Sequence, residues 1–322
     1  MTAPPAALKT RAGLIQFPAY LPVTTFGGRY PLDALLHPYL PRLAQAAMVS
    51  LHYALQRSDE RLPLPLFVDS GGFASLFERA ELIERGSLGA IAWREFDAQP
   101  SGEDPSALQR QSEPPRGPEE VLAAQERLAD VAFTLDFPIP PRLSEDQQER
   151  EKRLRLTVNN ARWAIKNRRR RDLPLYACVQ GWDLESYRAC AEAFVGLPFD
   201  GIAIGGLVPR ARDEALIFAV VDAVRALHPE SPLHLFGLGR PELVRVLFQR
   251  GVQSIDSSAY VRLAAEGRRW GVSAPPLDDP APLERLEIAL SNLAYATQST
   301  LPLSAAPLLF CAGSAHLSRD QS

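Results

Sequence analysis

Residues 64–73 read Leu-Pro-Leu-Phe-Val-Asp-Ser-Gly-Gly-Phe, and this stretch decides the fold. The apolar run from Leu64 to Val68 predicts a short buried strand, and residues 74–85 after it are expected to form a helix. The two glycines allow positive φ angles or a close approach of a ligand to the backbone. A strand, an acid, a glycine turn and a helix in this order are typical of α/β enzymes, which carry catalytic side chains at strand ends. Taken alone, the stretch favours a tight turn in which Asp69 caps the helix.

The pattern of a strand followed by a helix repeats along the chain. Further strands are expected at 47–53, 131–137, 175–180, 201–207, 233–239 and 252–256. Helices are expected at 31–46, 118–130, 144–171, 184–197, 213–227, 241–250 and 282–297. This alternation favours a parallel sheet with crossover helices, and the number of units predicts a closed (β/α)8 TIM barrel. Residues 14–26 mix β-formers with prolines, which indicates edge strands or a hairpin over the barrel floor.

The chain is expected to form a single domain, because 322 residues fit one α/β barrel. The barrel domain is expected to span residues 13–298, after a flexible N-terminus at 1–12. Residues 94–118 are rich in Pro, Ser, Gln and Glu without a hydrophobic period, which predicts a long loop beside the site. Residues 299–322 are expected to form a tail that is partly disordered.

Composition narrows the classes of partner and location. A net charge of −3 gives no global basic field, so any contact with a polynucleotide must come from a local patch. Three widely spaced cysteines fit neither a disulfide framework nor a zinc cluster, and they suit a reducing cytoplasmic location. No signal peptide or long apolar span is evident, so no membrane contact is expected.

Polar and glycine residues stand at the predicted strand ends, which converge on one face of a barrel. They are Asp69, Asp136, Gln180, Gly205, Gly206, Gly237 and Asp256. Three carboxylates, a carboxamide and bare backbone together predict a site for a small planar polar ligand. No histidine is among them, and the glycine turns lack a P-loop lysine. An acid–base pair would therefore be Asp with Asp, which fits glycosyl transfer, where one carboxylate attacks an anomeric carbon and the other moves a proton.

Six motifs in this order resemble the tRNA-guanine transglycosylases, over about residues 13–270. They are Asp69-Ser-Gly-Gly-Phe73, Phe133-Thr-Leu-Asp136, Val179-Gln-Gly181, Phe199-Asp-Gly-Ile-Ala-Ile-Gly-Gly-Leu207, Phe236-Gly-Leu-Gly239 and Ile255-Asp256. Each motif is weak by itself, whereas six in order at plausible spacing are specific. The resemblance implies a pentosyltransferase that exchanges guanine in a nucleic acid for a 7-deazaguanine base, and it implies no cofactor.

The resemblance also implies roles for individual residues. Asp256 would attack C1′ of the target nucleoside and form a covalent glycosyl-enzyme, and Asp69 would take a proton from the incoming base. The residues expected to bind the base are Ser70, Phe73, Asp136, Gln180, Gly205, Gly206, Leu207 and Phe236, the two phenylalanines by stacking on its faces. Other interpretations stay open: both phenylalanines fit plain core residues, and Asp136 fits a cap of the turn before Pro138.

The sequence departs from the family pattern after the predicted nucleophile. Family members carry a zinc site there, with a C-x-C-x-x-C pattern and a distant histidine, but residues 257–298 contain neither Cys nor His. Residues 254–260, Ser-Ile-Asp-Ser-Ser-Ala-Tyr, look like those of divergent relatives that insert 7-deazaguanines into DNA. The polynucleotide is therefore expected to be tRNA or DNA, with DNA slightly favoured.

A non-catalytic role is the alternative function. Family members in eukaryotes pair with an inactive homologue, so the barrel fits an inactive nucleic-acid-binding subunit, and a homodimer or a partner subunit fits equally. The presence of both Asp69 and Asp256 argues against inactivity.

Two basic clusters compete for the polynucleotide. Arg262, Arg268 and Arg269 follow Asp256 and are expected to border the site as phosphate contacts. The run from Lys166 to Arg171 precedes a barrel strand and is expected at the opposite face, as a solvated helix end.

Overall fold

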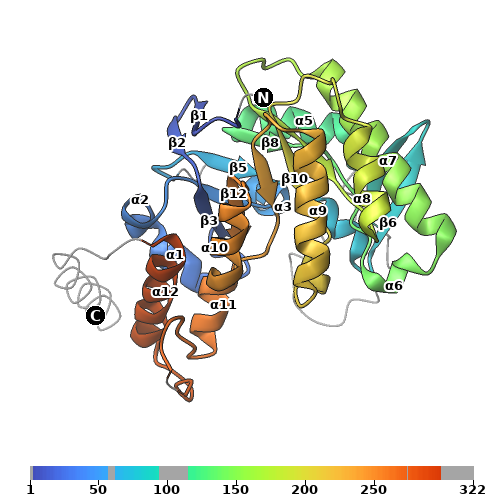
Figure 1. Cartoon of the computed structure of the whole chain (residues 1–322). Helices are drawn as coiled ribbons and strands as arrows, with labels where there is room; N and C mark the ends of the chain where they lie inside the picture. Colours follow the sequence, from blue (N-terminus) through green and yellow to red (C-terminus); the bar gives the residue numbers. More distant parts are fainter. Residues whose placement is uncertain (1–2, 57–61, 94–114, 274, 299–322) are drawn as a thin grey trace, which may run out of the picture.

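The computed structural model describes residues 3–56, 62–93, 115–273 and 275–298. Eight parallel strands close into a barrel, which confirms the predicted (β/α)8 fold (Figure 1). The strands follow one another around the barrel in chain order. They are β3 (Ala19–Thr24), β4 (Ala47–Val49), β5 (Leu66–Val68), β8 (Val131–Phe133), β9 (Leu175–Val179), β10 (Gly201–Ile204), β11 (Leu233–Leu235) and β12 (Ser254–Ser257).

Helices connect these strands and cover the outside of the barrel (Figure 1). The longer ones are α5 (Pro118–Leu128), α7 (Gln147–Asn167), α8 (Leu184–Glu192), α9 (Glu214–Leu227), α10 (Pro241–Gln249) and α12 (Pro282–Thr297). The short ones are α1 (Pro31–Leu36), η1 (His37–Tyr39), α2 (Leu40–Leu43), α3 (Leu51–Gln56), η2 (Gly72–Leu76), α6 (Pro141–Ser144), η4 (Val208–Arg210) and α11 (Ala259–Ala265). Proline opens α5, α10 and α12, where the first turn loses no hydrogen bond by it. Asp183 and Asp213 cap α8 and α9 with their carboxylates.

Two hairpins lie outside the barrel. The first pairs β1 (Ala7–Thr10) with β2 (Gly13–Gln16), so the segment expected to be a flexible start contains a strand. The second pairs β6 (Ala80–Arg85) with β7 (Leu88–Trp93), and the helix predicted for residues 74–85 is therefore wrong. Pairing with β7 and packing on α7, whose Asn160 bonds both backbone groups of Gly89, outweigh the local helical pattern.

The strand predicted for residues 47–53 is also shorter than expected. It ends at Val49, because the backbone N–H of Leu51 donates to the Asp69 carboxylate at 3.0 Å and α3 begins there. Asp69 thus caps α3 on the neighbouring unit, and the interpretation that it caps the helix after its own strand is wrong. The Asp69 carboxylate therefore belongs to the candidate site and also fixes the end of β4.

The predicted helix at 144–171 is α7, which is shorter at both ends. Asp146 caps it by accepting from the Glu149 N–H at 3.0 Å. Arg168, just past its end, is buried, pairs with Asp200 and donates to the Leu173 carbonyl. Arg168 is therefore a structural residue rather than part of a solvated helix end.

Large side chains fill the inside of the barrel. They include Leu21, Met48, Phe67, Phe133 and Tyr176, none more than 2% exposed. Burying each contributes about 1.5–3 kcal/mol relative to exposure. These side chains fill the barrel below the carboxyl ends of its strands, so the barrel interior itself leaves no room for a ligand among the described residues.

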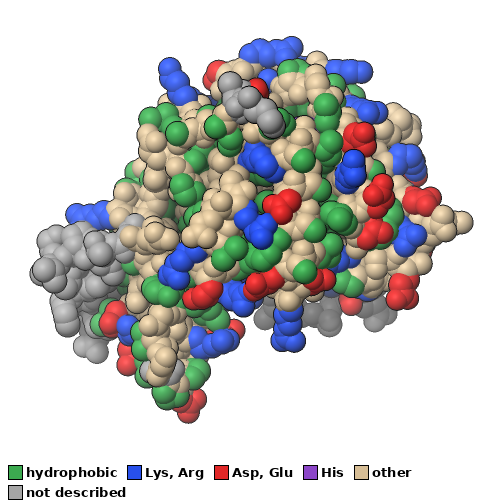
Figure 2. Space-filling model, in the orientation of Figure 1, with side chains coloured by type: hydrophobic (Ala, Val, Ile, Leu, Met, Phe, Trp, Pro, Cys, Tyr) green, Lys and Arg blue, Asp and Glu red, His purple; other side chains and the backbone are tan. Residues whose placement is uncertain are grey.

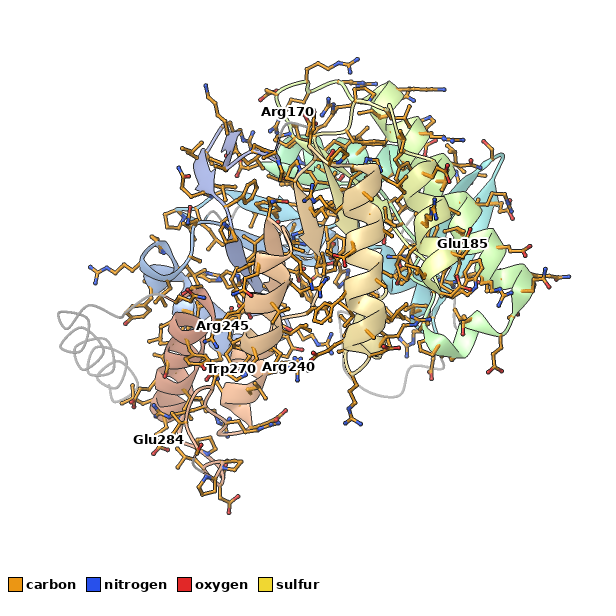
Figure 3. The ribbon with its side chains drawn as sticks, in the orientation of Figure 1. Arg170, Glu185, Arg240, Arg245, Trp270 and Glu284 are labelled. Carbon is orange, nitrogen blue, oxygen red and sulfur yellow. The ribbon has the colours of Figure 1, made fainter. Side chains whose placement is uncertain are left out.

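The chain after β12 folds into α11 and α12, which lie together at one side of the molecule (Figure 1). Asn292 ties them, since its carboxamide accepts from the Trp270 N–H at 2.7 Å and donates to the carbonyls of Tyr260 and Arg268. Arg245 of α10 lies 4.9 Å from the ring centroid of Tyr295 in α12, and Figure 3 labels Arg245 and Trp270 in this part of the molecule. No helix in the described part of the chain is long and apolar enough to cross a membrane.

Residues 94–114 of the predicted loop and the predicted tail at 299–322 lie outside the described residues. Both stay predictions, as does the extent of the domain.

Candidate active site

Three neighbouring strands meet at Asp136, which follows β8. The Ser70 hydroxyl, after β5, donates to Oδ1 of Asp136 at 2.7 Å. The Gln180 amide, after β9, donates to Oδ2 at 2.5 Å. Burial raises the pKa of Asp136, and the hydrogen bonds from Ser70 and Gln180 oppose the rise. The predicted residues Ser70, Asp136 and Gln180 are thus brought together, and Asp136 is more than a cap of the turn that follows it.

Gln180 leaves one strong acceptor unused. Its Oε1 is buried and has no hydrogen-bond partner within the described residues. An unpaired buried acceptor costs about 1–3 kcal/mol. The neighbouring backbone is bare because a Cβ at Gly205 would clash with the Gln180 amide, and Gly206 has φ +74°. Gln180 and the glycine pair therefore form one wall with an unpaired acceptor, which can receive an N–H group of a ligand.

Leu207, the third residue expected in this wall, has a fully buried side chain that packs in the core outside the barrel. Only its backbone is therefore a candidate for contact with a ligand.

Asp69 is half-buried at the end of β5. Its Oδ1 accepts from the N–H groups of Leu51 at 3.0 Å and Gly71 at 2.8 Å. Burial raises the pKa of Asp69 to about 6, against the effect of these bonds, and the charge of Asp136 raises it further. A carboxyl group with such a pKa can take up and release a proton close to neutral pH.

The two glycines after Asp69 have separate structural tasks. Gly71 has φ +72°, in the left-handed region that favours glycine. A Cβ at Gly72 would overlap the backbone carbonyl of Asp136. Gly72 therefore lets the loops after β5 and β8 approach closely enough for Ser70 to reach Asp136.

Asp256 lies on β12 and is 7% exposed. Its Oδ1 accepts from the backbone N–H of Gly237 at 3.1 Å, and Nε2 of His234 is also 3.1 Å from it. No histidine stands among the strand-end residues considered in the sequence, yet His234 within β11 contacts Asp256. The signal was available, because in Leu-His-Leu-Phe at 233–236 alternation places His234 and Phe236 on one face of the strand.

The two predicted stacking residues have different surroundings. Phe236 is half-buried, with its ring 5.0 Å from that of Phe133 and 4.8 Å from that of His234. Phe73 is 60% exposed and packs edge-on against Phe77, with ring centroids 5.8 Å apart. Phe73 is therefore not a core residue, and its ring is accessible to a ligand.

The predicted phosphate contacts lie after β12. Arg262 is exposed on α11. Arg268 pairs with Glu266 at 3.3 Å and Arg269 with Glu287 at 3.4 Å. Surface pairs of this kind contribute about 0–1 kcal/mol, so a phosphate can displace the carboxylates.

The competing basic run lies at the far end of the barrel. Arg170 lies near the top of Figure 3, and Arg240, which follows β11 at the rim of the site, lies well below it. The run from Lys166 to Arg171 is thus remote from the site, as its place before β9 predicts.

The residues do not fit the family's zinc site. The segment 257–298 supplies no Cys or His ligand. No group of three or more His, Cys, Asp or Glu side chains that could hold a metal is present in the ranges that the structure describes. No step of the chemistry is therefore assigned to a metal.

Comparison with known proteins adds an independent line of evidence. The family model described as queuine tRNA-ribosyltransferase matches residues 105–306. The tRNA-guanine(15) transglycosylase of Methanothermobacter thermautotrophicus is 34% identical over 156 residues, which cover 46% of this chain and 23% of that protein. The enzyme of the same name from Methanopyrus kandleri is 30% identical over 199 residues, 60% of this chain and 42% of that protein.

A bacterial relative aligns over more of the chain. The queuine tRNA-ribosyltransferase of Cereibacter sphaeroides is 28% identical over 309 residues, 86% of this chain and 75% of that protein. The matched segments span only 23% and 42% of the lengths of the first two relatives, so this chain corresponds to less than half of each of them.

Proposed function

Because the chain belongs to the queuine tRNA-ribosyltransferase family, we propose that it exchanges guanine in a polynucleotide for a 7-deazaguanine base. The observation that carries the proposal is the wall formed by Asp136, Gln180 and the glycine pair, at the same end of the barrel as Asp69 and Asp256. Such a wall offers oxygen acceptors to a flat ring edge rich in N–H groups. The carboxylates of Asp69 and Asp256 are then available for the two chemical steps.

In the first step, the carboxylate of Asp256 attacks C1′ of the target nucleoside. The bond from C1′ to the guanine nitrogen breaks, and a covalent glycosyl ester forms on Asp256. The departing nitrogen takes a proton from the protonated form of Asp69. The pKa of about 6 keeps a usable fraction of that form near neutral pH.

In the second step, the incoming 7-deazaguanine replaces the proton that Asp69 lost in the first step. Its ring N–H gives a proton to Asp69 while the nitrogen attacks C1′, and the carboxylate of Asp256 leaves. Both carboxyl groups are then in their starting states, and no other reactant is consumed.

The base is held by its edge and by its faces. Oε1 of Gln180 accepts one N–H of the base, and Asp136 accepts others by exchanging one of its present partners for the ligand. Phe236 and Phe73 stack on the ring, and each base–aromatic contact is worth about 1–3 kcal/mol. Backbone groups of Gly205, Gly206 and Leu207 complete the contacts.

Two polynucleotides are candidates. tRNA is favoured by the relatives, whose names describe action on tRNA. DNA is favoured by the sequence 254–260 and by the lack of zinc ligands after it.

The test is incorporation of labelled base. The protein is incubated with radiolabelled guanine and either tRNA or DNA, with Asp256→Asn as the matched control. Label in one polymer with the wild type and none with the variant supports exchange and identifies the polymer. Binding of either polymer without label or covalent adduct would instead favour the inactive-subunit alternative.

A further inference from the structure

His234 takes no chemical part in either of the two steps of base exchange. It stands on β11 with its side chain inside the barrel, and it is fully buried. Both ring nitrogens have partners on the adjacent strand. Nδ1 is 2.9 Å from the Ser254 hydroxyl, and Nε2 is 3.1 Å from Oδ1 of Asp256.

The chemistry of the partners fixes the direction of these bonds. An ionised carboxylate only accepts, so Nε2 carries the proton and donates to Asp256. In the neutral ring Nδ1 then accepts, and the Ser254 hydroxyl donates to it. Ser254 and Asp256 are two residues apart on β12, so their side chains face the same way and the imidazole bridges them.

The surrounding rings restrict rotation of the imidazole. The rings of Phe236, Phe133 and Phe67 have centroids 4.8, 5.1 and 6.2 Å from that of His234. A side chain that is packed on these sides and bonded at both nitrogens has one orientation.

One oxygen of Asp256 is held and the other is left available. Among the described residues, the hydrogen bonds to this carboxylate come from His234 and Gly237, and both end on Oδ1. The carboxylate cannot rotate without losing both. Oδ2 is therefore the oxygen that can attack a ligand.

We propose that His234, oriented by Ser254, is a positioning residue that fixes Asp256 with Oδ2 directed at the reacting carbon. The proposal rests on the proposed role of Asp256 as nucleophile. The same two donors stabilise the charge that returns to Oδ1 when Asp256 leaves in the second step. Reacting atoms must be held close to their reactive geometry, and a misplacement of about 1 Å can cost about 100-fold in rate.

The experiment measures the single-turnover rate of covalent adduct formation with the polymer that takes up guanine. His234→Phe keeps a flat ring but removes both hydrogen bonds, and the rate is expected to fall about 100-fold. The KM for guanine and the Kd for the polymer are expected to change by less than about threefold, since neither ligand touches His234. His234→Gln, which can still donate to Oδ1, is expected to recover at least about tenfold of the loss.

A purely structural histidine would give a different result. His234→Phe would then lower the midpoint of thermal unfolding while the folded protein formed adduct at the wild-type rate, and this outcome would overturn the proposal. If His234→Phe does not fold, Ser254→Ala decides. Loss of its single bond is expected to slow adduct formation several-fold, and an unchanged rate would equally overturn the proposal.

Failure of the proposed function is separable from failure of this inference. If the wild type forms no adduct, or Asp256→Asn forms it as well as the wild type does, the role of Asp256 fails. If only Asp256→Asn loses the adduct and the His234 and Ser254 variants do not, the positioning role alone fails.

Discussion

At the scale of single residues, Asp69 combines a structural task with a proposed chemical one. Its carboxylate starts α3 and holds the glycine turn, yet burial raises its pKa to about 6. The folded protein therefore binds the Asp69 proton more tightly than the unfolded chain, whose carboxyl has a pKa near 3.8. Stability linked to this group is fully present below about pH 4 and is lost as the pH rises through about 6.

The first prediction follows from this linkage. Asp69→Asn keeps an oxygen that accepts from Leu51 and Gly71 but cannot ionise. It is expected to raise the thermal midpoint at pH 7.5, with a difference from wild type that vanishes towards pH 4. Base exchange is expected to fall about 10²–10⁴-fold because the proton acceptor is lost. Thermal melts between pH 4 and pH 8 test the first part, and a variant less stable than wild type at pH 7.5 would contradict it.

The second prediction concerns Asp256. Asp256→Asn preserves an oxygen that accepts from His234 and Gly237, so folding is expected to be unchanged. Exchange is expected to be abolished because a carboxamide does not form the glycosyl ester. Denaturing gels of the protein with labelled polymer test this, and an undiminished covalent band from the variant would exclude Asp256 as nucleophile.

Residues at strand ends were accessible to sequence reasoning. Asp136 and Gln180 stand immediately after apolar runs, and the parallel barrel brings them together as expected. His234 was missed because it lies inside a strand, where an isolated histidine reads as core. Only the closed barrel brings it to Asp256.

At the scale of elements, the local hydrophobic pattern predicted the wrong secondary structure where contacts with residues distant in the sequence determine it. Residues 80–85 carry apolar positions that suit a helix or a strand, and the pairing of β6 with β7 decides between them. The boundary after β4 depends on a carboxylate from the next strand, which no window around Val49 contains. Seven of the eight barrel strands were predictable because buried parallel strands are short apolar runs. The exception is β3, which contains Pro22 and was expected to be an edge strand or part of a hairpin over the barrel floor, but which lies in the barrel between β12 and β4.

The third prediction tests the close contact of two loops. Gly72→Ala places a methyl group against the Asp136 carbonyl, and overpacking of this kind typically costs about 1–3 kcal/mol. It is also expected to weaken guanine binding, because Ser70 and Asp136 are pushed apart. Gly196→Ala is the control. That site has open space around it and φ +76°, so its cost of about 1–2 kcal/mol is conformational and guanine binding is unchanged. Urea denaturation and guanine binding to both variants are measured, and equal guanine affinity would contradict the prediction.

At the scale of the whole molecule, charge is dispersed. The face in Figure 2 shows cationic and anionic side chains interspersed, in keeping with a net charge of −3. Binding of a polynucleotide must therefore depend on the position of a few arginines relative to the site.

The fourth prediction compares the two ends of the barrel. Replacing Arg268 and Arg269 with glutamine is expected to weaken binding of the polymer and to lower the slope of log affinity against log salt by about one unit per contact. Arg169 and Arg171, both exposed at the far end, are the matched control and are expected to have little effect. Arg170 is left intact because it donates to the Glu126 carbonyl. A larger loss in the Arg169/Arg171 variant would place the polymer at the wrong end for Asp256.

The fifth prediction concerns metal content. Because residues 257–298 lack Cys and His, the purified protein is expected to hold no stoichiometric zinc. Elemental analysis measures this directly, and one zinc per chain would refute it.

The barrel closes where β12 pairs with β3, with Ser254 opposite Ala19 and Asp256 opposite Leu21. The proposed nucleophile therefore lies on the seam that joins the last barrel strand to the first. This contact has a long sequence separation, so its loop entropy is among the largest that folding must overcome. Asp69, Asp136 and Gln180 follow strands that precede β12 in the chain, so the site is complete only when β12 has paired. Base exchange is therefore expected only from molecules in which the barrel has closed, so exchange activity measures the fraction of molecules with a closed barrel.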